Sequence, residues 1–173
     1  MSQWIAQNIK ENFNSLVFKD FFQPDSILIP IPRSGLMQSG TLWVPDRVAN
    51  ALVKQGLGAR AIPCLERTIA VPKAAYSLPK DRPSAQMNYD SLKVLQGLIS
   101  IPKRILLIDD IVTSGSTAVG AANRLREAFP GAQISTFAAM RTISRKIEFG
   151  SEYSPYVGNI RLYPDGRCWR RPQ

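Results

Sequence analysis

The sequence ILLIDDIVTSGSTA, residues 105–118, constrains the fold of this chain more than any other segment. Residues 105–108 are all aliphatic, which predicts a strand buried on both faces, as in a parallel sheet. Asp109 and Asp110 follow directly, and open α/β sheets bind their ligands at the carboxyl ends of the strands. The two neighbouring acids are therefore candidate ligand-binding residues.

After the acids comes a small loop rich in hydroxyl groups, which leads into a helical pattern over residues 118–129. Such a loop presents hydroxyls and successive backbone N–H groups to an anion. An isolated Asp-Asp pair would more often simply end a strand, but here the acids and the loop support one another. Together they suit a ligand with hydroxyls and a phosphate, such as ribose 5-phosphate. The residues expected around the phosphate are Ile111, Val112, Thr113, Ser114, Gly115, Ser116 and Thr117.

The rest of the pattern predicts an α/β fold of three layers, with a central, mostly parallel sheet flanked by helices and a C-terminal β-hairpin. We expect one domain over residues 1–173 with a core at about 26–140, an N-terminal helix at 1–20 and a hairpin tail at 156–173. The other predicted strands are residues 26–31, 58–65, 91–95 and 133–139, and the other predicted helix is residues 45–55. Pro-Asp-Gly at residues 164–166 is a strong hairpin signal.

Composition limits the function classes. No apolar stretch approaches the roughly twenty residues that cross a bilayer, and the start of the sequence lacks the layout of a secretory signal. We therefore expect a cytoplasmic protein without a membrane partner. Cys64 and Cys168 are far apart, so the sequence encodes neither a disulfide framework nor a four-cysteine zinc site, and Cys64 is expected to be buried packing.

The 173 residues include no histidine, which excludes Ser-His and Cys-His nucleophile pairs. Any chemistry must depend on carboxylates, cations, hydroxyls and metal. The formal net charge of +9 indicates a polyanionic partner, which could be a phosphorylated small molecule or a nucleic acid, although a basic surface can also simply aid solubility.

Residues 105–118 closely resemble the phosphoribosyl pyrophosphate (PRPP) binding motif of type I phosphoribosyltransferases. The resemblance implies that Asp109 and Asp110 hold the ribose 2- and 3-hydroxyls and that Thr113 to Thr117 surround the 5-phosphate. It further implies Mg²⁺ as cofactor, held mainly by substrate phosphates and reached by the two acids through water.

The segment PIPRSG, residues 30–35, occupies the position of the pyrophosphate-binding loop in this family. Two prolines fix an extended bend, and Ser-Gly permits a tight turn. We expect the Arg33 side chain and the backbone of Ser34 and Gly35 to face the pyrophosphate, because a guanidinium suits forked phosphate contacts. Arg33 joins Asp109 and Asp110 as a predicted catalytic residue.

Residues 66–90 contain several X-Pro turns and cations but no sustained period, which predicts an unusually long loop. Members of the resembled family have a flexible loop here that closes over PRPP. The candidate cations that could reach the departing pyrophosphate are Arg67, Lys73, Lys80 and Arg82. Arg141, at the end of a later predicted strand, could touch the acceptor or face solvent.

The resemblance implies transfer of a 5-phosphoribosyl group to a small nitrogenous acceptor of unknown identity, with release of pyrophosphate. PIPRSG and CLERT, residues 64–68, most resemble the ComF-like branch, which is related to amidophosphoribosyltransferases and associated with DNA uptake. Two alternatives stay open. The protein could be a PRPP-binding regulator without transferase activity, or a nucleic-acid adaptor that uses an arginine-rich hairpin. Alternation along the hairpin strands is also explained, more simply, by one packed face and one solvated cationic face. A homodimer through the N-terminal helix is also open. The hairpin residues are Arg161, Tyr163, Arg167, Trp169, Arg170 and Arg171.

Overall fold

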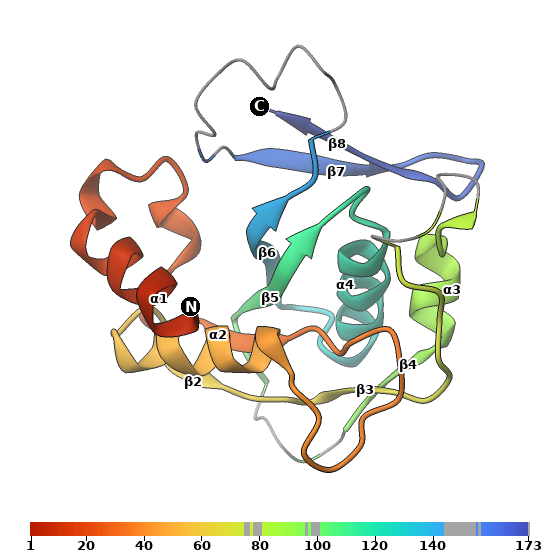
Figure 1. The fold of residues 1–173 in the computed structure, drawn as a ribbon, viewed down its shortest axis with the longest axis horizontal. Helices are drawn as coiled ribbons and strands as arrows, with labels where there is room; N and C mark the ends of the chain where they lie inside the picture. Colours follow the sequence, from red (N-terminus) through yellow and green to blue (C-terminus); the bar gives the residue numbers. More distant parts are fainter. Residues whose placement is uncertain are drawn as a thin grey trace.

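The computed structural model describes residues 1–74, 77, 81–95, 97, 101–143, 155 and 157–172. Its centre is a sheet of four parallel strands in the order β2-β1-β5-β6 (Figure 1). This arrangement confirms the predicted parallel sheet, and β5, which carries the two acids, is an inner strand. The strands are β1 (Ile27–Pro30), β2 (Arg60–Ala61), β5 (Arg104–Val112) and β6 (Gln133–Arg141).

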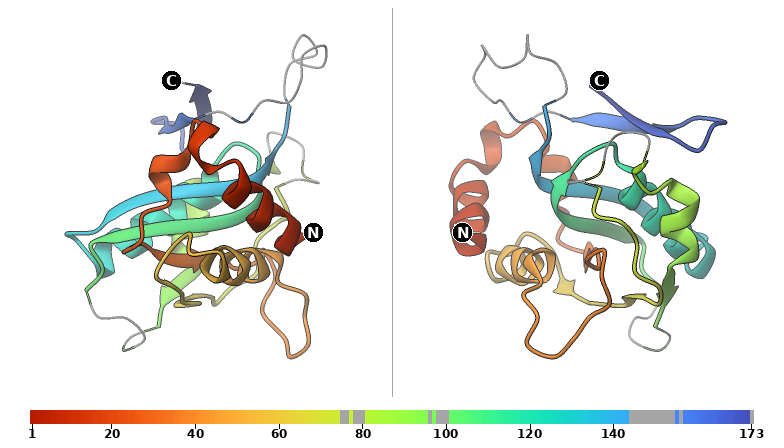
Figure 2. Two further views of the ribbon diagram at one scale, coloured as in Figure 1. Left: turned by 90° about the vertical axis from the view of Figure 1, so that its left-hand side faces the viewer. Right: turned by 45° about the vertical axis from the view of Figure 1, so that its right-hand side comes forward.

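Helices cover both faces of the sheet. Side chains alternate between the two faces along each strand, so each face has apolar side chains that pack against helices. Leu28 and Leu106 pack with the first two helices, whereas Ile29 and Leu107 pack with α4 on the opposite face. The predicted three-layer α/β architecture is therefore confirmed (Figure 2). The helices of these layers are α1 (Ser2–Glu11) and α2 (Val44–Lys54) on one face and α4 (Ser116–Ala128) on the other.

The central strand is longer than predicted. Residues 105–108 are fully buried, as expected, but β5 continues to Val112 because Asp109, Ile111 and Val112 pair with residues of β6. The two acids thus lie inside the strand, near its carboxyl end, instead of following it. Their backbone is held by the sheet, which fixes where their carboxylates point.

The predicted strand at 58–65 is wrong in its bounds. Pro63 cannot donate a ladder hydrogen bond, and the chain changes partners at this point. Residues 60–61 form β2 in the central sheet, while β3 (Leu65–Arg67) pairs antiparallel with β4 (Leu92–Val94) in a separate small sheet. The strand predicted at 91–95 is confirmed as β4. Cys64, between the two strands, is fully buried, as predicted.

The N-terminal helix is also shorter than the predicted 1–20. It ends at Glu11, and two 3₁₀ turns follow, at Phe13–Ser15 and Lys19–Phe21. The Asn12 side chain donates to the carbonyl of Asn8, and such local bonds compete with a continuing helix. The apolar residues of this region still pack on the body, where Phe22 contacts Phe137 of β6.

The predicted loop at 66–90 contains regular structure. Its first residues belong to β3, and residues 85–90 form α3 (Ala85–Asp90), whose first turn is capped by the Ser84 hydroxyl accepting from Met87 N. A helix of six residues is too short to give a periodic signal. α3 packs closely on α4 at Gly120, where an added Cβ would lie 2.7 Å from the Ala85 carbonyl oxygen.

The predicted C-terminal hairpin is confirmed, with β7 (Gly158–Leu162) antiparallel to β8 (Cys168–Pro172). It lies over the end of the central sheet at which β5 and β6 have their carboxyl ends (Figure 1). Ile160 packs against Gly115 at the start of α4, and Cys168 is buried. Among the helices that the structure describes, none is long and apolar enough to cross a membrane.

Candidate functional site

A cavity of about 310 Å³ opens where β1 and β5 end and α4 begins. Pockets for small ligands commonly have this size, and this place in an α/β sheet is where they are expected. The cavity brings together most of the residues that the sequence singled out. The predicted site residues that line it are Arg33, Ser34, Arg67, Lys73, Asp109, Asp110, Ile111, Val112, Thr113, Gly115 and Thr117.

The two acids are held by hydrogen bonds to backbone N–H groups of the residues that follow them. Asp109 Oδ1 accepts from the backbone N–H of Asp110 at 2.9 Å, and Asp110 Oδ1 accepts from that of Ile111 at 2.9 Å. The Asp109 carboxyl group also interacts with the Asp110 carboxyl group, so the two acids form one pair at the edge of the cavity. Burial, together with the neighbouring Asp110 carboxylate, raises the pKa of Asp109 to about 8.

The start of α4 forms the second part of the site. Gly115 has φ +94°, a left-handed conformation that glycine adopts without strain, and it precedes the first helical residue. The first N–H groups of a helix have no intrahelical partner, and the helix dipole favours an anion beside them. Gly115 and Thr117 line the cavity, so these donors border the same space as the two acids.

Two hydroxyls of the predicted phosphate loop lie outside the cavity lining. Ser116 is buried, and its Oγ is 3.0 Å from that of Ser114. Burial raises the pKa of the Cys168 thiol, and a hydrogen bond with Ser116 lowers it in part. The hairpin, which carries Cys168, therefore contacts this serine. Ser114 and Ser116 therefore shape the loop, while Thr113 and Thr117 are its hydroxyls on the cavity wall.

Three cations line another part of the cavity wall, namely Arg33, Arg67 and Lys73, and this part is the cationic end of the site. Arg33 is exposed, whereas Arg67 keeps only 2% of its surface exposed. Arg67 Nε donates to the Arg33 carbonyl at 2.7 Å, and its two Nη atoms donate to Ser91 Oγ and to Asn88 Oδ1. Burial lowers the pKa of Arg67 to about 10. Within the described residues, Arg67 has no carboxylate partner, which leaves its charge available to an anion in the cavity.

The other candidates from residues 66–90 fall in different places. Arg67 belongs to a strand and not to a loop, which differs from the prediction. Lys73 lines the cavity, in a segment that is fixed to the PIPRSG loop where Val71 N donates to the Ser34 carbonyl at 2.8 Å. Arg82 is not in the lining, and its Nε donates to the Ser77 carbonyl at 3.4 Å. Lys80 lies outside the described residues.

Gly35 and Arg141 are not in the cavity lining. The residues of the PIPRSG loop that line it are Ile31, Pro32, Arg33 and Ser34. Sequence reasoning missed Trp43, whose indole N–H donates to the Ile31 carbonyl at 2.8 Å and whose ring forms part of the cavity wall. It also missed Asn88. No local pattern marks either residue, because both act through partners that are distant in sequence.

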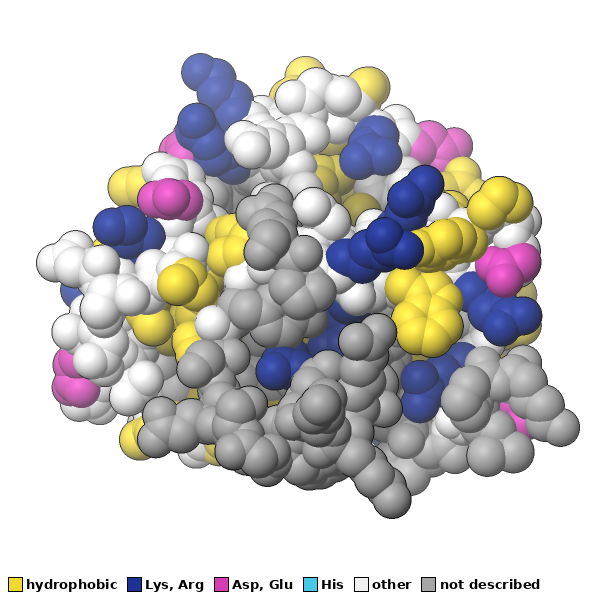
Figure 3. All heavy atoms as spheres, turned by 90° about the horizontal axis from the view of Figure 1, so that it is seen from above, with side chains coloured by type: hydrophobic (Ala, Val, Ile, Leu, Met, Phe, Trp, Pro, Cys, Tyr) yellow, Lys and Arg dark blue, Asp and Glu magenta, His cyan; other side chains and the backbone are white. Residues whose placement is uncertain are grey.

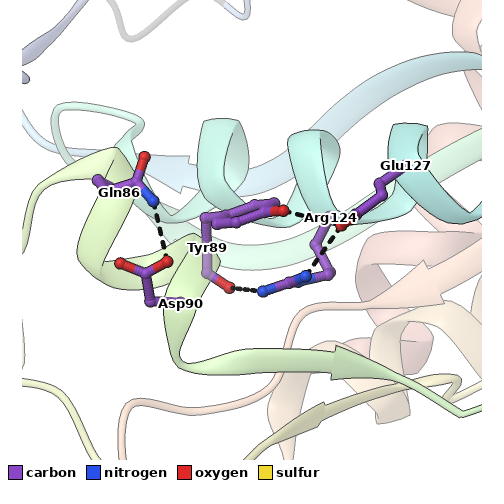
Figure 4. A network of polar contacts seen from close by, with 5 residues as sticks. All are labelled: Gln86, Tyr89, Asp90, Arg124 and Glu127. Atoms are coloured by element: carbon purple, nitrogen blue, oxygen red, sulfur yellow. Dashed lines mark hydrogen bonds and ion pairs between the residues drawn. The ribbon is translucent and has the colours of Figure 1, made fainter.

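A polar network attaches α3 to α4 (Figure 4). Tyr89 Oη donates to Glu127 Oε2 at 2.8 Å. The Arg124 guanidinium lies over the Tyr89 ring and donates to the backbone carbonyl of Tyr89 at 3.0 Å. Because α3 carries Asn88 and leads to Ser91, this attachment also positions the partners of Arg67. The helix that presents the N–H donors and the strand that presents the buried cation are thus parts of one packed unit.

The described residues include no cluster of three or more His, Cys, Asp or Glu side chains that could hold a metal ion alone. Asp109 and Asp110 supply hard oxygen donors of the kind that Mg²⁺ prefers, but only from two side chains. Mg²⁺ usually keeps several waters and is bound through one or two carboxylates together with substrate phosphates. The residues present therefore fit Mg²⁺ that enters with a phosphorylated ligand.

No protein-family model matches the chain, and no curated protein matches it. Two crystal forms of a hypoxanthine phosphoribosyltransferase from Staphylococcus aureus resemble its structure. The tetragonal form is 13% identical, with a TM-score of 0.43, over 81% of this chain and 74% of the other. For the orthorhombic form the values are 14%, 0.42, 83% and 76%. A likeness this weak supports no inference about ligand or reaction.

Proposed function

We propose that the protein binds PRPP and transfers its 5-phosphoribosyl group to a small nitrogenous acceptor. The observation that carries the proposal is the convergence of three kinds of binding group on one cavity: two neighbouring carboxyl groups, the N–H groups at the start of α4, and the guanidinium groups of Arg33 and Arg67. PRPP requires this combination, because it carries a diol, a monophosphate and a pyrophosphate on one sugar.

In the proposed complex, Asp109 and Asp110 accept hydrogen bonds from the ribose 2- and 3-hydroxyls. The N–H groups and hydroxyls of the loop between β5 and α4 bind the 5-phosphate. The sugar would thus be held at two points, which limits how its anomeric carbon can be oriented in the cavity. Orientation of this kind can supply a large part of the rate enhancement of a displacement reaction.

During transfer, the bond between the anomeric carbon and the pyrophosphate oxygen breaks, and pyrophosphate leaves with the electron pair. The acceptor nitrogen uses its lone pair to form the new bond to the same carbon, and the proton that it then loses passes to water. Negative charge grows on the leaving group, so fixed cations beside it stabilise the transition state more than the ground state. Arg33, Arg67 and Lys73, which line the cavity, would supply these cations. Mg²⁺ bound with PRPP would supply further positive charge at the phosphates.

The test is to measure pyrophosphate release from PRPP and Mg²⁺ against a panel of purines, pyrimidines and amines. Release that depends on one acceptor class supports the proposal and identifies the acceptor. PRPP binding without release for any acceptor would instead favour a regulator that binds PRPP without transfer. The same panel can be repeated without Mg²⁺ to examine the metal requirement. The assignment to the ComF-like branch stays a prediction.

The substitution Asp110→Asn examines the diol contact directly. Loss of a hydrogen bond to a charged group costs about 1.5 to 3 kcal/mol, so we expect PRPP affinity to fall about tenfold or more in calorimetry. Asp20→Asn, at an exposed aspartate outside the cavity, is the matched control and should bind as the wild type does. Unchanged affinity in Asp110→Asn would remove the role assigned to the acids.

A further inference from the structure

The C-terminal hairpin has two faces of different character. Ile160 packs against Gly115, Cys168 is buried, and Arg170 donates to the Thr142 carbonyl, so these residues form the inner face. Residues directly opposite each other in an antiparallel pair share a face, and side chains alternate along each strand. Arg161 opposite Trp169 therefore belongs to the outer face.

The outer face carries arginines and aromatic rings in close succession. Trp169 is 57% exposed, and the guanidinium of Arg161 lies 5.4 Å from the centre of the Tyr163 ring. Arg171 Nη2 donates to Tyr163 Oη at 2.7 Å. In Figure 3, which looks down on this side, basic side chains lie beside hydrophobic ones over the region where the hairpin runs in Figure 1.

Most of this positive charge is not neutralised by neighbouring acids. Arg167 forms an ion pair of 3.1 Å with Asp165 in the turn. Within the described part of the chain, no carboxylate pairs with Arg161 or Arg171. Arg170, which the sequence grouped with them, belongs to the inner face and serves the packing of the hairpin. The outer face thus consists of three guanidinium groups and two rings.

We propose that this outer face binds single-stranded nucleic acid. Exposed rings stack on unpaired bases of any sequence, while arginines beside them bind the phosphates. The same rings have no access to bases that are stacked within a duplex. The net charge of +9 attracts the same partner at long range. The inference does not depend on transferase activity, because none of these residues lines the cavity.

The test is fluorescence anisotropy with labelled DNA and RNA strands of about ten nucleotides, a length in the range of known single-strand sites. We expect binding to both or to one of them, and much weaker binding to a duplex of the same sequence. The plot of log affinity against log salt should have a slope of about −1.4, because Arg161 and Arg171 can each neutralise one phosphate and each phosphate neutralised on a single strand contributes about −0.7. A duplex bound as tightly as the single strand would overturn the proposal.

Two sets of variants separate stacking from charge. Trp169→Ala should weaken binding at least fivefold, because the stacking of about one base is lost. Trp169→Phe, which keeps a ring, should retain most of the wild-type affinity. Replacement of Arg161, Arg167 and Arg171 by Gln should abolish binding. The control replaces Lys54, Arg60 and Arg126, which are exposed and outside the hairpin, and changes the net charge equally.

All variants should retain the wild-type melting temperature within a few degrees, because the packed inner face of the hairpin is unchanged. If both triple variants weaken binding equally, or if Trp169→Ala binds as the wild type does, the attraction belongs to the overall charge of the protein and the proposed surface is wrong.

Discussion

The two ends of the cavity offer an anion different kinds of partner. At the start of α4 the donors are neutral, namely backbone N–H groups and the hydroxyls of Thr113 and Thr117. At the other end they are charged, namely the side chains of Arg33, Arg67 and Lys73. Fixed neutral donors suit a group whose charge stays constant, such as a 5-phosphate. Cations suit a group that gains charge, such as a departing pyrophosphate.

The ends also differ in how they are built. The loop before α4 obtains its shape from local sequence, through a glycine in the left-handed region and the helix that follows it. The cationic end is assembled from three separate segments, because Arg67 of β3 holds the Arg33 carbonyl and is held in turn by Asn88 and Ser91. Substitutions should therefore disturb the cationic end over a wider part of the molecule.

The largest effect is expected from Arg67→Met. The side chain fits the same space approximately, but Ser91 Oγ and Asn88 Oδ1 lose a donor in a buried place, and the Arg33 carbonyl loses one in a partly buried place. Unsatisfied buried acceptors cost about 1 to 3 kcal/mol each, partly offset because a desolvated cation is removed. We expect the free energy of unfolding in urea to fall by about 3 kcal/mol.

Pyrophosphate affinity of Arg67→Met should also fall, about tenfold or more, because a charged hydrogen-bond partner is lost. Arg67→Lys keeps the charge with fewer donors, so it should retain part of the affinity while losing stability. Arg126→Met, at an exposed arginine of α4, is the control and should change stability by less than about 0.5 kcal/mol. A stable Arg67→Met protein that binds pyrophosphate normally would show that this end of the cavity is assembled differently.

A smaller and more local effect is expected at the neutral end from Gly115→Ala. The new Cβ would lie 2.6 Å from Ile160 Cγ2, and φ +94° is strained for alanine. Overpacking and this backbone strain each cost about 1 to 3 kcal/mol, so we expect a loss of about 2 to 3 kcal/mol. Gly131→Ala, where an added Cβ has open space, is the control.

The double variant Gly115→Ala with Ile160→Ala separates the two causes. Ile160→Ala removes the three atoms nearest to the new Cβ, so mainly the backbone strain should remain when the double variant is compared with Ile160→Ala alone. Affinity for ribose 5-phosphate should follow the strain, since the N–H donors move with the loop, whereas pyrophosphate affinity should be nearly unchanged. Equal losses for both ligands would mean that the two ends are not independent.

The same contrast explains how far the sequence predicts this molecule. The apolar run of β5, the acids, the glycine loop and α4 follow one another along the chain, so their order alone predicts the neutral end and the acids. The hairpin was predicted for the same reason, since its turn is contained in three consecutive residues. In each case the physical cause acts over a few neighbouring positions.

The cationic end was predicted less completely. Arg67 was named as a candidate, but its burial depends on β4 and α3, which follow about twenty residues later. α3 has too few residues for a periodic pattern, and Pro63 divides a segment that reads as one strand. Trp43 and Asn88 take part only through tertiary contacts. A sequence pattern cannot show a site that exists only after distant segments have packed.

The smallest effect concerns Asp109, which lies between the two ends and, unlike the neutral donors, titrates near neutral pH. Its pKa of about 8 in the folded protein is above the ordinary value of 3.8, so the folded state binds more protons than the unfolded state at intermediate pH. The contribution of this group to the free energy of unfolding is therefore fully present at low pH and is lost as pH rises from about 4 to 8. Between about pH 7 and 8.5 the expected loss is about 1 kcal/mol.

Thermal unfolding of the wild type and of Asp109→Asn across this range measures that loss. The amide oxygen of the substituted side chain could still accept from the Asp110 N–H, but the group would not ionise, so the variant should lack the part of the pH dependence that Asp109 causes. Ribose 5-phosphate should oppose the wild-type trend, because an ionised Asp109 accepts better from a hydroxyl and binding becomes tighter as pH rises. Identical pH profiles for the two proteins would show that Asp109 ionises well below neutral pH. Asp109 would then differ from the donors at the two ends of the cavity in its position alone.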